Sequence, residues 1–121
     1  FLSAKAVLPE MIRKGKGTII QMLSIASTKA FAGGTAYGAS KFGALGFTNA
    51  LREEVRSKGI KVISVMPGAV DTPAWDEEER EESRDKMMQP EDIAQAILDI
   101  LKQPQRTLVE EIILRPIGGD L

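Results

Sequence analysis

Residues 18–41 read TIIQMLSIASTKAFAGGTAYGASK and combine an apolar run, a loop of small residues and the start of a long helix. The run from Thr18 to Leu23 has no polar alternation, which is typical of a strand that is buried on both faces of a parallel sheet. Residues 25–34 predict a loop that ends in two glycines. The helix that follows is predicted over 35–57. This order of elements predicts one unit of an α/β fold.

The rest of the chain repeats the alternation of helices and strands. Residues 1–14 predict a helix that Pro9 kinks or breaks. Strands are predicted at Ile60–Met66 and Val109–Leu114, and a helix at 90–103, where Pro90 and the acids after it suit a helix start. Strands separated by helices give right-handed crossovers. We therefore expect a partial Rossmann-like three-layer α/β fold, with a parallel sheet of three strands flanked by helices.

Two of these helices are expected to present apolar faces. In the first, the apolar face is formed by Leu2, Ala6, Met11 and Ile12. In the long helix, the apolar anchors are Phe42, Leu45, Phe47, Leu51 and Val55. The first half of the long helix also contains Gly38, Gly43 and Gly46, and glycine destabilises a helix relative to alanine. So many small residues indicate that a ligand or a neighbouring helix approaches this backbone closely.

Composition excludes several classes of function. The 121 residues carry a net charge of −1 from 16 basic and 17 acidic residues, so no general field attracts nucleic acid or an anionic membrane. Without histidine or cysteine, the chain holds no Ser-His-Asp triad, no thiolate nucleophile and no disulfide, and we expect no metal site. No apolar run has transmembrane length. A cytoplasmic location and a single domain at most are expected.

The best candidate chemistry lies in Tyr37, the single tyrosine, and Lys41, one helical turn later. An ammonium close to a phenol favours the phenolate, which makes the tyrosine a usable proton donor and acceptor. Ser24, at the end of the apolar run, would orient a substrate oxygen. A tyrosine beside a lysine is more often an exposed pair without function, because lysine is common. The surrounding strand, glycine-rich loop and helix favour the catalytic interpretation.

A further turn, Pro67-Gly68, follows the second predicted strand. Ligands of open parallel sheets bind beyond the carboxyl ends of the strands. Ser24 and Pro67-Gly68 both lie at such ends, and Tyr37 begins the helix that leaves the first strand. We therefore expect these residues to converge on one edge of the sheet.

With Ser24, the motif Tyr37-Gly-Ala-Ser-Lys41 and the turn Pro67-Gly68-Ala-Val70-Asp-Thr72 in this order, the chain resembles the C-terminal half of a short-chain dehydrogenase/reductase. The resemblance implies that Tyr37 is the general acid and base. It implies that Lys41 favours the phenolate and holds the nicotinamide ribose, and that Ser24 binds the substrate carbonyl or hydroxyl.

The same resemblance implies that Tyr37 and Lys41, together with the turn residues Pro67, Gly68, Val70 and Thr72, bind the cofactor, NAD or NADP. Ser27 is the rival serine and is interpreted as a loop residue. Residues 76–86 correspond to the variable substrate lid of the family. From the residues alone, this charge run is interpreted as a mobile exposed helix or linker. Whether Trp75 packs or recognises substrate stays open.

The chain departs from the family pattern in what it lacks. The glycine-rich dinucleotide loop, T-G-x-x-x-G-x-G, is absent from residues 1–121, and so are the residue that selects NAD or NADP and the catalytic asparagine. We therefore interpret the chain as a fragment, the C-terminal half of a Rossmann domain. It is expected to derive from an NAD(P)-dependent oxidoreductase that interconverts alcohols and ketones and to be inactive alone.

The expected partners follow from the same resemblance. They are a small carbonyl or alcohol substrate and a second copy of the chain, which would pack through the helices at 1–14 and 35–57. The first strand is also expected to leave one edge of the sheet open. The alternative is a non-catalytic half-domain that only dimerises or complements its other half.

Overall fold

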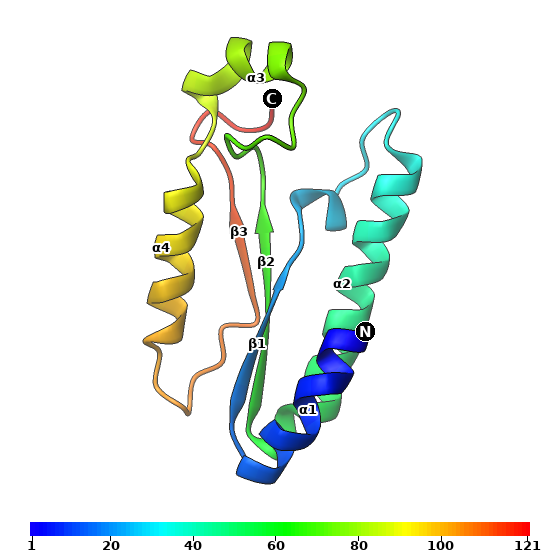
Figure 1. Ribbon diagram of the computed structural model, residues 1–121, viewed down its shortest axis with the longest axis vertical. Coiled ribbons are helices and arrows are strands. Elements are labelled where there is room, and N and C mark those ends of the chain that lie inside the picture. Colours follow the sequence, from blue (N-terminus) through cyan, green and yellow to red (C-terminus); the bar gives the residue numbers. More distant parts are fainter.

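The computed structural model describes residues 1–121 and contains four helices and three strands (Figure 1). The helices are α1 (Leu2–Lys14), α2 (Thr35–Val55), α3 (Glu77–Ser83) and α4 (Pro90–Leu101). The strands are β1 (Gly17–Met22), β2 (Ile60–Pro67) and β3 (Glu111–Leu114). Three short 3-10 turns complete them: η1 (Ile25–Ser27), η2 (Arg56–Lys58) and η3 (Arg84–Lys86).

The strands form one parallel sheet with β2 in the centre, in the order β1-β2-β3. Gly17 to Met22 pair with Ile60 to Val65, and Ser64 to Pro67 pair with Glu111 to Leu114. Helices α1 and α2 cover one face of the sheet and α4 covers the other (Figure 1). The predicted three-layer fold is therefore confirmed, and the carboxyl ends of all three strands lie at the same end of the molecule. The outer edge of β1 pairs with no strand, and its residues are at most partly buried, with Met22 50% exposed, so the predicted burial of this strand on both faces is wrong.

Alternate residues of β2 build a core on each face of the sheet. Ile60 and Val62 join Ala4, Leu51 and Val55 of the helices on one side. Ile63 and Val65 join Ile93 and Ile100 of α4 on the other. Because β2 is buried on both faces, its sequence is mostly apolar, with Lys61 and the buried Ser64 as its polar residues, as expected for the middle strand of a parallel sheet.

The apolar face of α1 differs from the predicted one. The helix runs unbroken through Pro9 and packs with Ala4, Leu8 and Met11, while Leu2 is 77% exposed and Ile12 38% exposed. Proline in a helix interior removes one backbone hydrogen bond; the tertiary packing on both sides of Pro9 holds the helix together. Spacings of four and three residues select the buried stripe, and Leu2 and Ala6 lie outside it.

The prediction for α2 is correct at its C-terminal half and wrong at its start. Leu51 and Val55 are buried and Phe47 packs against the core, but Phe42 is 47% exposed. A Cβ added at Gly38, Gly43 or Gly46 would meet no atom of the chain within 4 Å. No helix of this chain therefore approaches those glycines, and the small-residue surface faces outward.

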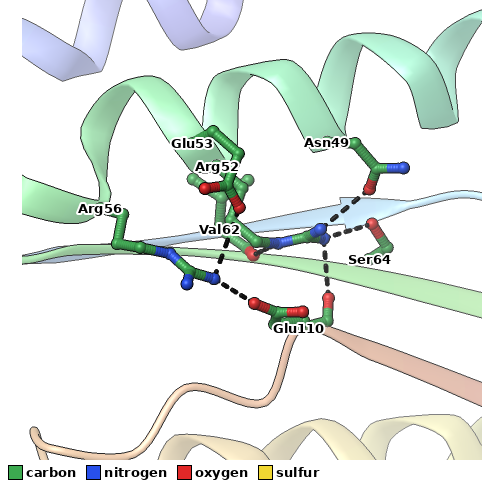
Figure 2. A network of polar contacts seen from close by, with 7 residues as sticks. All are labelled: Asn49, Arg52, Glu53, Arg56, Val62, Ser64 and Glu110. Carbon is green, nitrogen blue, oxygen red and sulfur yellow. Dashed lines mark hydrogen bonds and ion pairs between the residues drawn. The ribbon is translucent and has the colours of Figure 1, made fainter.

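A buried arginine joins α2 to the sheet (Figure 2). The Arg52 side chain is 4% exposed, and its Nε donates to the Val62 carbonyl at 2.8 Å. Its other nitrogens donate to Asn49 Oδ1, Ser64 Oγ and the Glu110 carbonyl at 2.8, 3.0 and 2.8 Å. Arg52 thus bonds to α2, to β2 and to the entrance of β3 at once, which fixes how the long helix lies on the sheet.

The ends of the elements follow their local chemistry. Helix α4 begins at Pro90 as predicted, and the Asp92 carboxylate accepts a hydrogen bond from the Gln89 amide at 2.8 Å. Gly59, the predicted end of the long helix, has a φ of 77°, and a Cβ there would meet the Gly15 carbonyl oxygen at 2.4 Å. The expected loop at 25–34 contains the turn η1, and β3 is shorter than predicted. No helix combines the length and apolar content that a membrane span requires.

Candidate active site

A cavity of about 510 Å³ opens at the carboxyl ends of the strands. Ser24 and Tyr37 both line it, and so do Pro67, Gly68, Val70 and Thr72 of the turn after β2. Six of the seven residues predicted for the site therefore surround one space. Lys41 is the exception, because it lies one turn further along α2 and does not line the cavity.

Ser24 follows β1 and occupies the N-cap of η1. Its Oγ accepts a hydrogen bond from the Ala26 amide at 3.1 Å, which holds the side chain at the cavity wall. The hydroxyl donates to no protein group, so its proton is free for an oxygen in the cavity. An oriented donor of this kind stabilises charge that develops on a substrate oxygen.

Tyr37 lies in the first turn of α2, which begins at Thr35. Its side chain is 55% exposed and lines the cavity, so the phenol is accessible to a small molecule. The Lys41 ammonium nitrogen lies 5.6 Å from the centre of the Tyr37 ring. A cation at this position over an aromatic ring is attracted to it. Lys41 therefore contacts the aromatic ring of Tyr37, and its effect on the phenol oxygen stays a prediction.

The turn after β2 also brings polar groups to the cavity. The Thr72 hydroxyl accepts a hydrogen bond from the Ala74 amide at 3.4 Å and keeps its own proton for a ligand. The Val70 amide donates none of the backbone hydrogen bonds of this loop. The amides of Asp71 and Met88, next to it at the Val70–Met88 bridge, both donate one. A free amide and a free hydroxyl at a cavity wall fit a ligand that carries a carboxamide or a phosphate.

Ser27, the rival serine, lies elsewhere. It belongs to η1, is fully buried and does not line the cavity. Its Oγ has no hydrogen-bond partner. The structure therefore separates the two serines by position and leaves Ser24 as the one that faces the cavity.

An acid next to the cavity-lining turn residues was missed from the sequence. Asp71, between Val70 and Thr72, pairs with Arg80 and, at 3.4 Å, with Arg84. The Arg80 guanidinium holds the pKa of the Asp71 carboxyl below its ordinary value of 3.8, against partial burial, with further help from Arg84. The charged run at 76–86 forms the exposed helix α3 and η3, and these pairs attach it to the turn. The available signal for this ion pair in the sequence was that Arg80 and Arg84 follow an acid, Asp71, in the turn that begins at Pro67-Gly68.

A second acid, in the C-terminal tail, was also missed from the sequence. Asp120 lines the cavity and pairs with Lys29 at 2.5 Å and with Arg115 at 2.8 Å. Lys29, and then Arg115, hold the pKa of Asp120 below 3.8. Since β3 is parallel to β1, the tail after β3 must leave the sheet at the edge where Ser24 lies, and this was the signal that pointed to it.

Comparison with known proteins decides the family. The sequence model of the short chain dehydrogenase family matches residues 1–83. The chain belongs to the short-chain dehydrogenase family. Over 121 residues it is 41% identical to a sepiapterin reductase of Chlorobaculum tepidum. The match covers all of this chain and 49% of the reductase.

Solved structures of short-chain dehydrogenases share the fold. A metagenomic short-chain oxidoreductase in complex with NADP superposes with a TM-score of 0.73 at 30% identity, over 93% of this chain and 44% of that one. An alcohol dehydrogenase of Thermococcus sibiricus complexed with 5-hydroxy-NADP superposes with a TM-score of 0.81 at 26% identity, over 98% of this chain and 49% of that one. The chain thus spans about half the length of these relatives.

Proposed function

We propose that this chain carries the catalytic residues of an NAD(P)-dependent oxidoreductase that interconverts an alcohol and a ketone. The observation that carries the proposal is that Ser24 and Tyr37 line one cavity together with the turn from Pro67 to Thr72. The family membership and the oxidoreductase names of the relatives support it. The non-catalytic half-domain is not favoured, because dimerisation alone gives no reason for free hydroxyl groups to gather at a cavity.

In the proposed reduction, Tyr37 donates its phenol proton to the carbonyl oxygen of the substrate, and in the oxidation it takes the proton back. Ser24 donates a hydrogen bond to the same oxygen and orients it. The Lys41 ammonium stabilises negative charge on the phenol oxygen. A nicotinamide cofactor supplies or accepts the hydride when it is bound.

The chain offers fitting groups for that cofactor. The unpaired amide of Val70 and the hydroxyl of Thr72 would hold its carboxamide and phosphate side, and Pro67 and Gly68 would shape the wall beside it. Tyr37 and Lys41 would hold the ribose. The choice between NAD and NADP depends on residues outside this set. The substrate is proposed to be a small carbonyl compound with an apolar body, since Phe31 and Trp75 also line the cavity.

A chimera tests the proposal. It joins residues 1–121 to the part of the Chlorobaculum reductase that this chain does not cover, and it is assayed with NADPH and NADH against sepiapterin and simple ketones. We expect turnover by the chimera, and none by residues 1–121 alone, because positioning of the cofactor supplies much of catalysis. Replacement of Tyr37 by Phe should lower kcat by about 10²–10⁴-fold. A Tyr37→Phe chimera that keeps full turnover would refute the proposal.

We also propose that the chain associates with a second copy through α1 and α2. The support is the outward-facing glycine surface of α2 and the exposed apolar side chains Phe1, Leu2 and Phe42. Light scattering at rising concentration should report a mass above that of a monomer. A clean monomer at high concentration would contradict this proposal and leave the catalytic one untouched.

A further inference from the structure

The segment from Thr72 to Lys86 is called the lid segment below. The residues that precede and follow it in the chain lie next to each other. Val70 and Met88 form an isolated parallel bridge at its base. The Met88 amide donates to the Ala69 carbonyl at 3.1 Å, and the Asp71 amide donates to the Met88 carbonyl at 2.9 Å. The two ends of the lid segment are therefore tied together.

Helix α3, within the lid segment, is not held by apolar packing. None of its residues is buried, and its N-cap Asp76 bonds only within the helix, to the Glu78 amide at 3.1 Å. A short helix without a buried face gains little from packing. Its position must therefore come from other contacts.

Asp71 provides those contacts. Its side chain is only 9% exposed, although the residue belongs to a loop. One carboxylate oxygen accepts a hydrogen bond from Arg80 Nε, and the other lies 3.4 Å from Arg84 Nε. Arg80 lies in α3, and Arg84, four residues later, is the C-cap of α3 and the first residue of η3. These ion pairs are the side-chain bonds that connect α3 to the rest of the protein.

The residues before and after Asp71 in the chain both line the cavity. Val70 and Thr72, its neighbours in the chain, line the cavity, and so do Ala74 and Trp75 at the start of the lid segment. We propose that Asp71 is a positioning residue that latches α3 to the turn after β2 and so holds Thr72 and Trp75 against the cavity. The role of the lid segment as a wall for substrate and cofactor rests on the proposed function. The latch itself does not.

Two measurements on residues 1–121 test the latch without any turnover. Trp75 is the single tryptophan, so its fluorescence and its quenching by acrylamide report the lid segment directly. Hydrogen exchange reports local opening of the same segment. In Asp71→Asn we expect exchange of the amides in 72–86 to become about tenfold faster, with Trp75 more readily quenched, because one partner of a partly buried ion pair is lost. Exchange in β2 should stay unchanged.

Asp85→Asn is the matched control, because it removes an acid from the same segment that makes no ion pair. It should alter neither measurement. The double variant Arg80→Gln and Arg84→Gln, which changes partly or fully exposed side chains, should reproduce the effect of Asp71→Asn even if the latter folds poorly. Unchanged exchange and quenching in the double variant would overturn the proposal.

Kinetics of the chimera then separate this inference from the proposed function. Asp71→Asn should raise KM for the carbonyl substrate and for the nicotinamide cofactor about tenfold, with a smaller change in kcat, because the walls of the cavity are loosened while Tyr37 and Ser24 stay in place. A fall in kcat alone would contradict a positioning role. A chimera with a working latch and no turnover would refute the proposed function and leave the latch standing.

Discussion

Lys41 holds its ammonium nitrogen 5.6 Å from the centre of the Tyr37 ring, one turn further along the same helix. This relationship puts a positive charge over the Tyr37 ring without placing the lysine in the cavity. The helix geometry of residues four apart is sufficient to produce it. The ammonium is therefore near the aromatic ring but outside the cavity that Tyr37 lines.

Replacement of Lys41 by Met in the chimera should lower kcat by roughly 100-fold, because negative charge on the phenol oxygen loses its nearby cation. Steady-state kinetics measure the loss. Lys58→Met is the matched control: Lys58 lies in η2, before β2 and away from the cavity, and forms no ion pair. Equal losses in both variants would show that the effect is general and not due to the Tyr37 pair.

Ser24 and Ser27 make a second matched pair. In the chimera, Ser24→Ala should lower kcat by roughly 10²–10³-fold, because a donor to the substrate oxygen is removed. Ser27→Ala should leave kcat unchanged. It should also raise the free energy of unfolding by about 1 kcal/mol, since it removes a buried hydroxyl that has no partner. Urea denaturation and kinetics on both variants check this, and the reverse pattern would assign the catalytic role to Ser27.

Arg52 and Arg56, four residues apart, allow the contribution of a buried arginine to be compared with that of an exposed one (Figure 2). Arg52→Ala should lower the free energy of unfolding by about 2–4 kcal/mol, because the Val62 and Glu110 carbonyls and the Ser64 hydroxyl lose a buried donor. Arg56→Ala should cost less than about 1 kcal/mol, because its pairs with Glu53 and Glu110 are exposed. Urea denaturation of residues 1–121 measures both. Similar costs would contradict the network as drawn.

Acid should weaken both attachments of the cavity walls. The folded-state pKa values of Asp71 and Asp120 lie below the ordinary value of 3.8. Their contribution to stability is therefore complete above that value and is lost as the pH falls through the lowered values. We expect the unfolding temperature to fall on acidification below about pH 4 and to fall less in Asp71→Asn and Asp120→Asn. Asp85→Asn, which removes an acid of η3 that makes no ion pair, serves as the control and should leave the profile unchanged. A profile that Asp71→Asn and Asp120→Asn do not flatten would contradict this assignment.

Much of the fold was predictable because it depends on local patterns. Thr18 to Leu23 and Ile60 to Met66 are mostly apolar runs, and such runs between helices indicate a parallel sheet. The convergence of Ser24, Tyr37 and Pro67-Gly68 followed from topology, since parallel strands end at one edge. Helical faces were less predictable. Periodicity alone does not say which of two apolar stripes on a helix packs against the sheet. Leu2 and Phe42 are apolar and were predicted to pack, but they are exposed.

The residues by themselves determined the element order, the parallel sheet and the group of side chains that meets at its edge. Only the tertiary structure decided that Ser27 is buried away from the cavity and that Arg52 is buried within the sheet contact. It alone decided that Asp71 binds Arg80 and Arg84, and that Asp120 binds Lys29 and Arg115. The physical reason is range: strand and helix patterns arise from neighbours in the chain, whereas an ion pair depends on where two loops come to lie once the core has packed.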